Sequence, residues 1–494
     1  MSLTRRNFLA ASSATVAWAA APAPGDVFFA SLTELSARLR KKEFSCVELT
    51  RAFADRLERL GPRYNALALS LRAPALKLAK DVDDEIKWDR LRSPLQGVPY
   101  GAKDLFAVEK RVTAWGAKPF ATQVFDYDAT VIRKLAKAKA PLLGKLAMVE
   151  LAGGPSYGGP SASVTGPCLN PWDVTRWAGG SSSGSGAAVA AGLVPWALGT
   201  ETSGSILTPS AFCGVTGLRP TYGLVSRYGA MELSHSLDKI GPMCRTAEDC
   251  GHVLAVIAGG DDNDPYSAGK SFYFAPEFVR PLKELRVGFA PVDFDVWADE
   301  AARPAFQAAL GVFRQMGVTV VEKKLPELPY GPTVRTLIMA EGSTAFRPLI
   351  ESGKVDELAD KVQIEGLKNG LKVTAADYLK AKTAQREITG AFGQLFSDVD
   401  VLIAPARLRV ADEALKPFDN TPAPPRSPDR GNTALIGASN VAGVPALSLP
   451  CGLVGGLPVG IQLVGRHFTE NTLLALGMEF QRRTEWHKQH PVVS

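Results

Sequence analysis

The order of apolar and polar positions predicts two helices near the start of the folded chain. Each helix opens on a Ser-x-x-Glu capping box, in which the serine and the glutamate bind free main-chain N–H groups. The boxes are Ser31 with Glu34 and Ser45 with Glu48. Leucines follow the first box at helical spacing, and an apolar stripe follows the second as far as Gly61.

Short apolar runs farther along the chain predict β-strands. They lie at 287–290, 318–321, 399–404, 446–449 and 461–464, and helical patterns separate several of them. Strands that alternate with helices are typical of a sheet covered on both faces. The pattern is therefore compatible with an α/β fold.

A proline-rich segment follows the strand expected at 399–404. Residues 405–431 contain six prolines, and connections this long inside a compact domain are usually functional or disordered. Open α/β sheets bind ligands at the carboxyl ends of parallel strands. The segment is expected either to form the rim of a substrate entrance or to be an ordinary surface loop.

The first 24 residues have the pattern of a leader. Arg5 and Arg6 stand in a basic stretch, and an alanine-rich apolar run follows to about Ala20. Adjacent arginines favour twin-arginine export, which would place the mature protein in the periplasm. The alternative is an ordinary basic N-terminus with a frayed alanine-rich tail. The folded domain is expected to begin near residue 26.

Composition narrows the functional classes. The net charge of +6 comes without a dense Lys/Arg run flanked by aromatic residues, so nucleic acid is not an expected partner. The apolar runs are too short to span a membrane. The six cysteines lack C-x-x-C spacing, which indicates neither a zinc site nor a disulfide framework.

Three segments of small residues carry the candidate chemistry. Residues 97–103 read Gly-Val-Pro-Tyr-Gly-Ala-Lys, residues 179–186 read Gly-Gly-Ser-Ser-Ser-Gly-Ser-Gly, and residues 199–205 read Gly-Thr-Glu-Thr-Ser-Gly-Ser. Serine attacks an amide only when a base removes its proton, and burial can make a lysine neutral enough to be that base. Two serines and one lysine can therefore form a hydrolytic site without histidine.

Each segment also has a structural interpretation. Lys103 can be a solvated lysine paired with Asp104. The glycine-serine run can be a linker, a phosphate loop or, through Ser182, a nucleophile elbow that requires a histidine. The run at 199–205 can be a tight turn, or its N–H groups can form an oxyanion hole. Those groups belong to Thr202, Ser203, Gly204 and Ser205.

Taken together, these segments resemble the amidase signature family. The resemblance continues through 211–223 (Ala-Phe-Cys-Gly-Val-Thr-Gly-Leu-Arg-Pro-Thr-Tyr-Gly), 236–243 (Ser-Leu-Asp-Lys-Ile-Gly-Pro-Met) and the runs at 443–450 and 456–462. It covers nearly the whole chain after the leader. It implies one large α/β domain over residues 26–494, with a twisted mixed β-sheet flanked by helices on both faces.

The resemblance also implies a Ser-cisSer-Lys triad. Ser205 would be the nucleophile and Lys103 the base, and Ser181, on a cis peptide bond, would pass protons between them. Ser182 would hold Lys103 through a hydrogen bond. The implied reaction is hydrolysis of a linear small-molecule amide to a carboxylate and ammonia or an amine, through an acyl-enzyme and without metal or cofactor.

Three positions depart from the family pattern. Glu201 stands where aspartate is usual, Ser203 where glycine is usual, and Leu207 where arginine is usual. Because Ser203 carries a Cβ, its main chain is less free than that of glycine, which bears on the geometry of the oxyanion hole.

Two alternatives accompany the amidase interpretation. Residues 199–250 look like the glutaminase subunit of glutamyl-tRNA(Gln) amidotransferase, which releases ammonia from glutamine with the same triad. Residues 340–385 lack the Asp-Gly-Val-Arg-Tyr-Gly run of that subunit, and a leader argues against a partner in translation. The second alternative is a non-catalytic amide-binding protein on the same scaffold. Aliphatic, aryl, fatty and peptide amides all fit the amidase interpretation.

Overall fold

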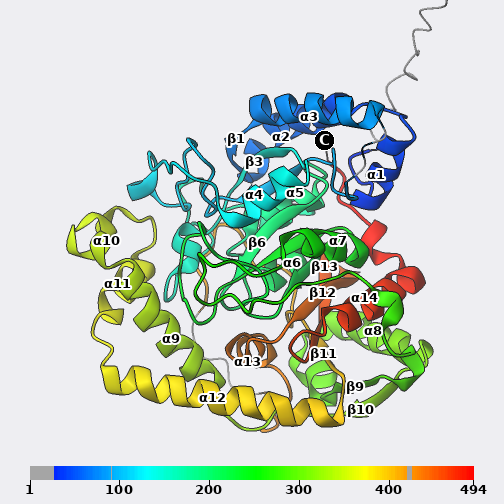
Figure 1. Cartoon of the computed structure of the whole chain (residues 1–494). Helices are drawn as coiled ribbons and strands as arrows, with labels where there is room; N and C mark the ends of the chain where they lie inside the picture. Colours follow the sequence, from blue (N-terminus) through cyan, green and yellow to red (C-terminus); the bar gives the residue numbers. More distant parts are fainter. Residues whose placement is uncertain (1–26, 89, 91, 420–425, 494) are drawn as a thin grey trace, which may run out of the picture.

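A computed structural model describes residues 27–88, 90, 92–419 and 426–493. One mixed sheet of 11 strands runs through these residues (Figure 1). In spatial order the strands are β1 (Leu67–Ser70), β3 (Leu142–Leu146), β2 (Tyr100–Lys103), β6 (Ala197–Glu201), β8 (Lys239–Cys244), β7 (Thr216–Arg219), β12 (Ala446–Val454), β13 (Leu457–Gly465), β11 (Val401–Pro405), β9 (Arg286–Phe289) and β10 (Thr319–Glu322). A separate two-stranded sheet consists of β4 (Leu169–Asn170) and β5 (Asp173–Trp177).

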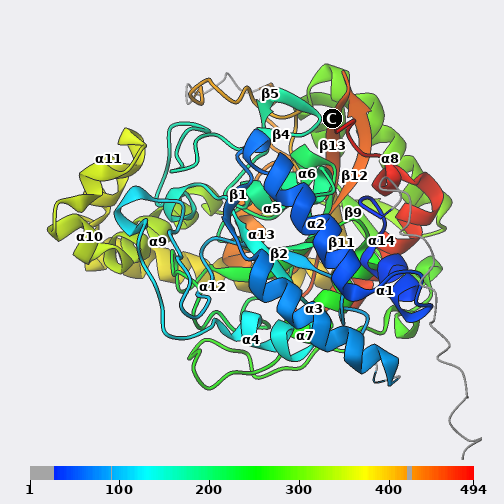
Figure 2. The ribbon, with the colours of Figure 1, turned by 90° about the horizontal axis from the view of Figure 1, so that it is seen from above.

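Helices flank the large sheet on both faces. Figure 1 places α1, α2 and α3 at the top of the molecule and α12 along the bottom, and Figure 2 shows α2 and α3 side by side. The helices are α1 (Leu32–Arg40), α2 (Cys46–Leu60), α3 (Arg72–Lys87), α4 (Thr130–Lys137), α5 (Ser183–Ala190), α6 (Leu207–Cys213), α7 (Ala247–Ile257), α8 (Arg303–Gln315), α9 (Tyr330–Ala345), α10 (Arg347–Glu351), α11 (Lys361–Gly370), α12 (Ala375–Asp398), α13 (Leu435–Ala442) and α14 (Glu470–Thr484). The α/β prediction is confirmed.

Both predicted capping boxes form. The amide of Glu34 donates to Ser31 Oγ at 3.1 Å, and the main-chain N–H of Ser31 donates to the Glu34 carboxylate at 2.7 Å. The same reciprocal pair opens α2 at Ser45. Gly61 ends α2, and a Cβ there would lie 2.4 Å from the carbonyl oxygen of Leu57, which explains the glycine.

The predicted strands all belong to the large sheet. Their buried apolar residues lie between helices on the two faces, as the alternating pattern indicates. β11 runs parallel to β9 and antiparallel to β13, so the sheet is mixed at this point. The proline-rich segment leaves the carboxyl end of β11, as predicted.

The strand order determines where the candidate chemistry meets. β2 and β6 are parallel neighbours, with Gly101 opposite Ala197 and Ala102 opposite Leu198. Parallel neighbours end at the same edge of a sheet. Lys103, the last residue of β2, therefore lies beside the turn that follows β6, although 97 residues separate it from Thr200 along the chain.

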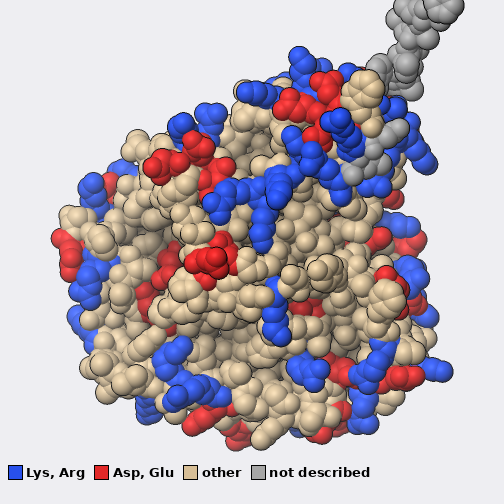
Figure 3. All heavy atoms as spheres, in the orientation of Figure 1, with Lys and Arg blue, Asp and Glu red and all other residues tan. Residues whose placement is uncertain are grey.

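Several sequence-based predictions concern the whole chain. The predicted leader, residues 1–24, lies outside the described residues. Within the described part, none of the helices is long and apolar enough to cross a membrane. All six cysteines are free and buried. On the face shown in Figure 3, basic and acidic side chains alternate with uncharged atoms instead of forming one continuous basic surface.

Candidate active site

Lys103 is fully buried at the end of β2. Its ammonium donates to Ser181 Oγ at 2.7 Å and to Thr200 Oγ1 at 2.9 Å. Asp104 points elsewhere, because its carboxylate pairs with Lys145 at 3.0 Å. The alternative of a solvated lysine paired with Asp104 is therefore wrong.

The surroundings of Lys103 favour its neutral form. Desolvation lowers the pKa of Lys103 from 10.5 to about 7, and the negative charges of Asp238 and Glu201 oppose that shift only in part. A large fraction of the side chains is therefore deprotonated near neutral pH. A neutral amine 2.7 Å from a serine hydroxyl can accept its proton.

Ser181, which bonds Lys103, directly precedes the residue that bonds the turn of Ser205. The peptide bond between Gly180 and Ser181 is cis. The next residue, Ser182, donates its main-chain N–H to the carbonyl of Ser205 at 3.2 Å, which ties the two serine segments together. The glycine-serine run also packs directly against α6, since a Cβ on Gly179 would lie 2.8 Å from a Cα of that helix. The run is therefore no linker.

Ser182 supports Lys103 differently from what the resemblance implied. Among the described residues, its hydroxyl makes no hydrogen bond with Lys103. The hydroxyl instead donates to the carbonyl of Thr200 at 3.1 Å and accepts from the N–H of Thr200 at 3.2 Å. Thr200 in turn accepts a hydrogen bond from Lys103. Ser182 therefore supports Lys103 indirectly, through the end of β6.

The turn from Thr202 to Ser205 presents unpaired main-chain donors. In the described part of the chain, the N–H groups of these four residues bind no acceptor. Gly204 has φ +92°, whereas the φ of Ser203 is not positive. The Cβ of Ser203 is therefore accommodated without strain, and Gly204 alone needs the glycine conformation.

Glu201 braces this turn. Its fully buried carboxylate accepts from the N–H groups of Ile206 and Leu207, both at 2.9 Å, and from Arg219 and Asn440, both at 2.7 Å. Burial raises the pKa of Glu201, but Arg219 and these hydrogen bonds outweigh it and hold the pKa below its usual value. The ionised glutamate thus fixes the start of α6 immediately after the turn.

Ser205 opens into a large cavity of about 930 Å³. Its walls combine the turn at 202–205, the segment from Ala152 to Tyr157, helix α9 and the beginning of the proline-rich segment. Charged residues on the walls are Arg335, Arg407, Arg409, Asp412 and Asp419. This lining agrees with the prediction that the proline-rich segment forms part of the rim of a substrate entrance.

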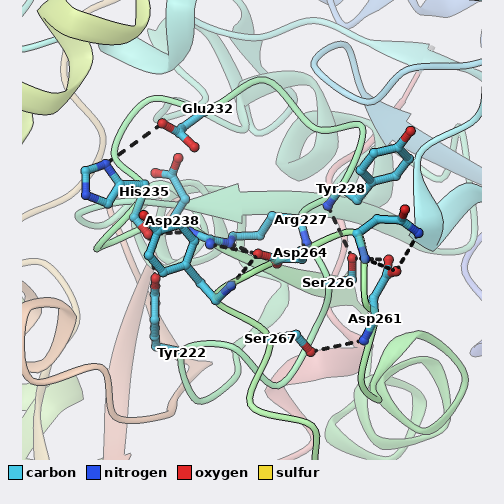
Figure 4. Close-up of polar contacts among 12 residues, drawn as sticks. Tyr222, Ser226, Arg227, Tyr228, Glu232, His235, Asp238, Asp261, Asp264 and Ser267 are labelled. Carbon is cyan, nitrogen blue, oxygen red and sulfur yellow. Dashed lines mark hydrogen bonds and ion pairs between the residues drawn. The ribbon is translucent and has the colours of Figure 1, made fainter.

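A smaller cavity of about 150 Å³ lies behind the turn. Thr202 lines both cavities, and its hydroxyl donates to Asp238 at 2.6 Å. Figure 4 shows Arg227 beside Asp238 and Asp264, and its guanidinium pairs with Asp264 at 3.1 Å. This polar network fixes the loop that carries Asp238, and through Thr202 it supports the turn at Ser205.

A histidine-dependent elbow at Ser182 does not form. Ser182 is fully buried, and no described histidine lines the cavity that Ser205 faces. His487 and His490 lie instead beside Phe29 and Arg245. Within the described chain there is also no cluster of three metal-ligating side chains.

Comparison with known proteins identifies the family. The family described as Amidase matches residues 48–474, so the chain belongs to the amidase signature family. The chain is 38% identical to a subunit of glutamyl-tRNA(Gln) amidotransferase from Dechloromonas aromatica over 487 residues, which cover 94% of this chain and 99% of that protein.

Two solved structures extend the comparison. The peptide amidase of Stenotrophomonas maltophilia is 30% identical, with a TM-score of 0.78, and the match covers 92% of this chain and 97% of that one. The corresponding glutamyl-tRNA(Gln) amidotransferase subunit of Thermotoga maritima is 26% identical, with a TM-score of 0.76, over 94% and 97% of the two chains. The fold implied by the resemblance is confirmed, and the chain is a member of a family of C–N hydrolases.

The prediction of periplasmic export is wrong. Curated relatives that are 36–38% identical over nearly their full length are subunits of an enzyme named for glutamyl-tRNA, an intracellular molecule. A short basic stretch followed by alanines is a pattern of low information content. The export prediction depended on this pattern alone, and similarity over 94% of the chain outweighs it.

Sequence reasoning missed two residues of the site. Thr200 binds Lys103, and Asp238 holds Thr202. Both lie within segments that carry the resemblance, at 199–205 and 236–243, but the sequence alone does not show which side chains lie near the lysine.

Proposed function

We propose that this protein cleaves a linear amide through an acyl-enzyme on Ser205. The observation that carries the proposal is the buried Lys103, whose nitrogen lies 2.7 Å from Ser181 Oγ beside the turn of Ser205. A neutral lysine that bonds Ser181, whose neighbour Ser182 bonds the main chain of Ser205, can provide a base and a proton relay for a nucleophile. In the same proposal, residues 26–494 form one amidase domain.

Acylation begins with a proton relay from Ser205 through Ser181 to Lys103. Neutral Lys103 takes the proton of Ser181, and Ser181 takes that of Ser205 while Ser205 Oγ attacks the carbonyl carbon. The N–H groups of the turn at 202–205 donate to the oxyanion. The relay runs in reverse to protonate the leaving nitrogen, the C–N bond breaks, and ammonia or an amine leaves. Water then attacks the acyl-enzyme and releases the carboxylate.

A second candidate is ammonia transfer from glutamine within a glutamyl-tRNA(Gln) amidotransferase. The curated relatives favour this candidate more directly than free hydrolysis, because they carry that name at 36–38% identity. The free-hydrolysis candidate draws its support from the peptide amidase, at 30% identity, and from a cavity much larger than glutamine. Both candidates share the acyl-enzyme step.

The shared step is tested with a fluorophosphonate, which reacts with activated serines. Mass spectrometry after peptide mapping should find one adduct on Ser205 and none in Lys103→Ala or Ser205→Ala. No adduct in the wild-type protein would support the amide-binding alternative. An adduct on Ser182 would contradict the assignment of the nucleophile.

The two candidates are separated by the amide that is consumed. Purified protein is incubated with glutamine and with a panel of primary alkyl, aryl and peptide amides, and ammonia is measured. Turnover of the panel without glutamine turnover supports free hydrolysis. Turnover of glutamine alone supports the second candidate, in which case partner subunits and an acceptor are the next requirement.

A further inference from the structure

Arg407, in the active-site cavity, makes no ion pair with a described carboxylate. Arg407 follows β11 and lines the cavity that Ser205 faces. Its guanidinium binds no carboxylate and no hydrogen-bond acceptor among the described residues. It lies instead over the ring of Phe212, whose centroid is 5.9 Å from Cζ.

The other charges of the cavity do not neutralise Arg407. Asp412 is held by Arg409 at 2.6 Å, and Arg335 on α9 adds a further positive charge. The side chain of Arg407 is exposed to the cavity, but the protein atoms around it lower its pKa by desolvation, and the charge of Asp412 opposes that shift. An unpaired guanidinium in such a place is stabilised by an anion, and its planar fork matches a carboxylate.

The length of helix α6 gives the scale of the distance between Arg407 and Ser205. Ser205 precedes α6, and Phe212 lies near its end. Seven residues of helix span on the order of 10 Å. Because Arg407 lies beside the end of α6 that is farther from Ser205, we infer a separation of that order between the guanidinium and Ser205. The carboxylate of glutamine is only about half as far from its amide carbon in a fully extended chain.

The wall near this end of the cavity is aromatic. Tyr157, Trp177 and Phe418 line the cavity, and their ring centroids lie 5.2–6.3 Å apart. Such a wall suits an apolar chain between the two polar ends of a ligand.

We propose that Arg407 binds the carboxylate at the far end of a linear amide whose other end is cleaved at Ser205. The substrate class is an ω-amide of an acid with an apolar linker of about eight bonds, because each bond adds about 1.2 Å in an extended chain. The assignment rests on the proposed amidase function and extends its free-hydrolysis form.

The experiment compares monoamides of dicarboxylic acids of increasing length. Ammonia release is measured for the monoamides of succinic, glutaric, suberic and sebacic acid, and for sebacamide, in which a neutral amide replaces the carboxylate. The wild-type kcat/KM should rise with length and be about 10- to 100-fold higher for the sebacic monoamide than for sebacamide, as expected for a hydrogen bond to a charged group.

Variants assign the preference to Arg407. Arg407→Gln should raise KM for the sebacic monoamide by a similar factor, leave its kcat within a few-fold, and leave sebacamide unchanged. The control is Arg426→Gln, which removes an exposed arginine that pairs with Asp299 outside the cavity lining. Its kinetics should match those of the wild type.

The outcomes separate this inference from the proposed function. Two results would leave the proposed amidase function intact but show that the carboxylate site is wrong. One is cleavage of sebacamide without a preference for the monoamide, and the other is an equal effect of Arg407→Gln on both substrates. An optimum at the glutaric monoamide would overturn the length and favour glutamine. If no amide is cleaved, calorimetry of the sebacic monoamide with Ser205→Ala and with Ser205→Ala/Arg407→Gln still tests the site: equal binding rejects it.

Discussion

At the scale of single residues, the buried amine of Lys103 sets the pH dependence expected of the reaction. Below its pKa of about 7 the ammonium cannot accept a proton, and above it the neutral amine can. The kcat/KM of the wild type should therefore rise through about pH 7. Lys103→Ala should lose on the order of 10³-fold at pH 7 and recover partly at alkaline pH.

The control for this prediction is Lys118→Ala, which removes an exposed lysine. Its pH profile should superimpose on that of the wild type. A Lys103→Ala variant with a flat, undiminished profile would show that another group is the base.

The same lysine makes stability depend on pH. Unfolded Lys103 binds a proton below about pH 10.5, whereas the folded one binds it only below about 7. Between these values the unfolded state holds one more proton on this lysine, so the contribution of Lys103 to the free energy of unfolding rises by about 1.4 kcal/mol per pH unit and is lost as the pH falls toward 7. Lys103→Met should remove this slope. Urea unfolding between pH 7 and 9.5 measures it, and parallel slopes would contradict the burial of an amine.

At the scale of elements, the turn between β6 and α6 depends on one glycine. Gly204 has φ +92°, and a Cβ there would lie 3.2 Å from Thr208 Oγ1 and 3.3 Å from Ile436. Gly204→Ala should lower kcat by about 10- to 100-fold, because moving the turn displaces the donors proposed to bind the oxyanion. Ser203→Gly, at the neighbouring residue, is the matched control, and its kcat should stay within a few-fold of that of the wild type. Equal effects of the two would argue against the turn as the oxyanion site.

The start of α6 depends on the charge of Glu201. Both carboxylate oxygens face donors, so the NH₂ group of a glutamine would oppose one of them and leave Arg219 buried without a counter-charge. Glu201→Gln should lower the free energy of unfolding by about 3–5 kcal/mol. Glu413→Gln, at an exposed pair with Lys416, should change it by less than about 0.5 kcal/mol. Urea unfolding at pH 7 compares them, and equal stabilities would show that Glu201 is not the brace.

At the scale of the whole molecule, burial of the cysteines predicts their reactivity. All six thiols are free and buried, and burial raises the thiol pKa of Cys168 and Cys451, among others. Native protein should react slowly with dithiobis-nitrobenzoate, and protein unfolded in urea without reductant should release six equivalents. Fewer than six would reveal disulfides that the structure does not contain.

The sheet explains why chemistry dispersed along the chain meets in one place. β2 and β6 are neighbours, so Lys103 reaches Ser181 across 78 residues and Thr200 across 97. The polar loop around Arg227 and Asp238 (Figure 4) is joined to the turn of Ser205, because Thr202 donates to Asp238. Substitutions that shift β2 against β6 should therefore impair activity without touching a reacting atom.

The sequence by itself determined the features that neighbouring residues control. Capping boxes at Ser31 and Ser45, the apolar strands and the three small-residue runs are local patterns, since capping, periodicity and turn formation act over a few residues. The resemblance then implied the sheet and named Lys103, Ser181 and Ser205 as site candidates. The export pattern was local as well, and it led to a wrong prediction.

Only the tertiary structure decided what depends on distant neighbours. The segment around Lys103 was by itself compatible with a solvated lysine. The packing of β2 inside the sheet removes water from Lys103 and lowers its pKa. The bond from Ser182 to Thr200, the brace at Glu201 and the unpaired Arg407 likewise follow from contacts between remote segments. Burial and pairing are properties of the assembled surroundings of a side chain, and they decide which of its chemistries is available.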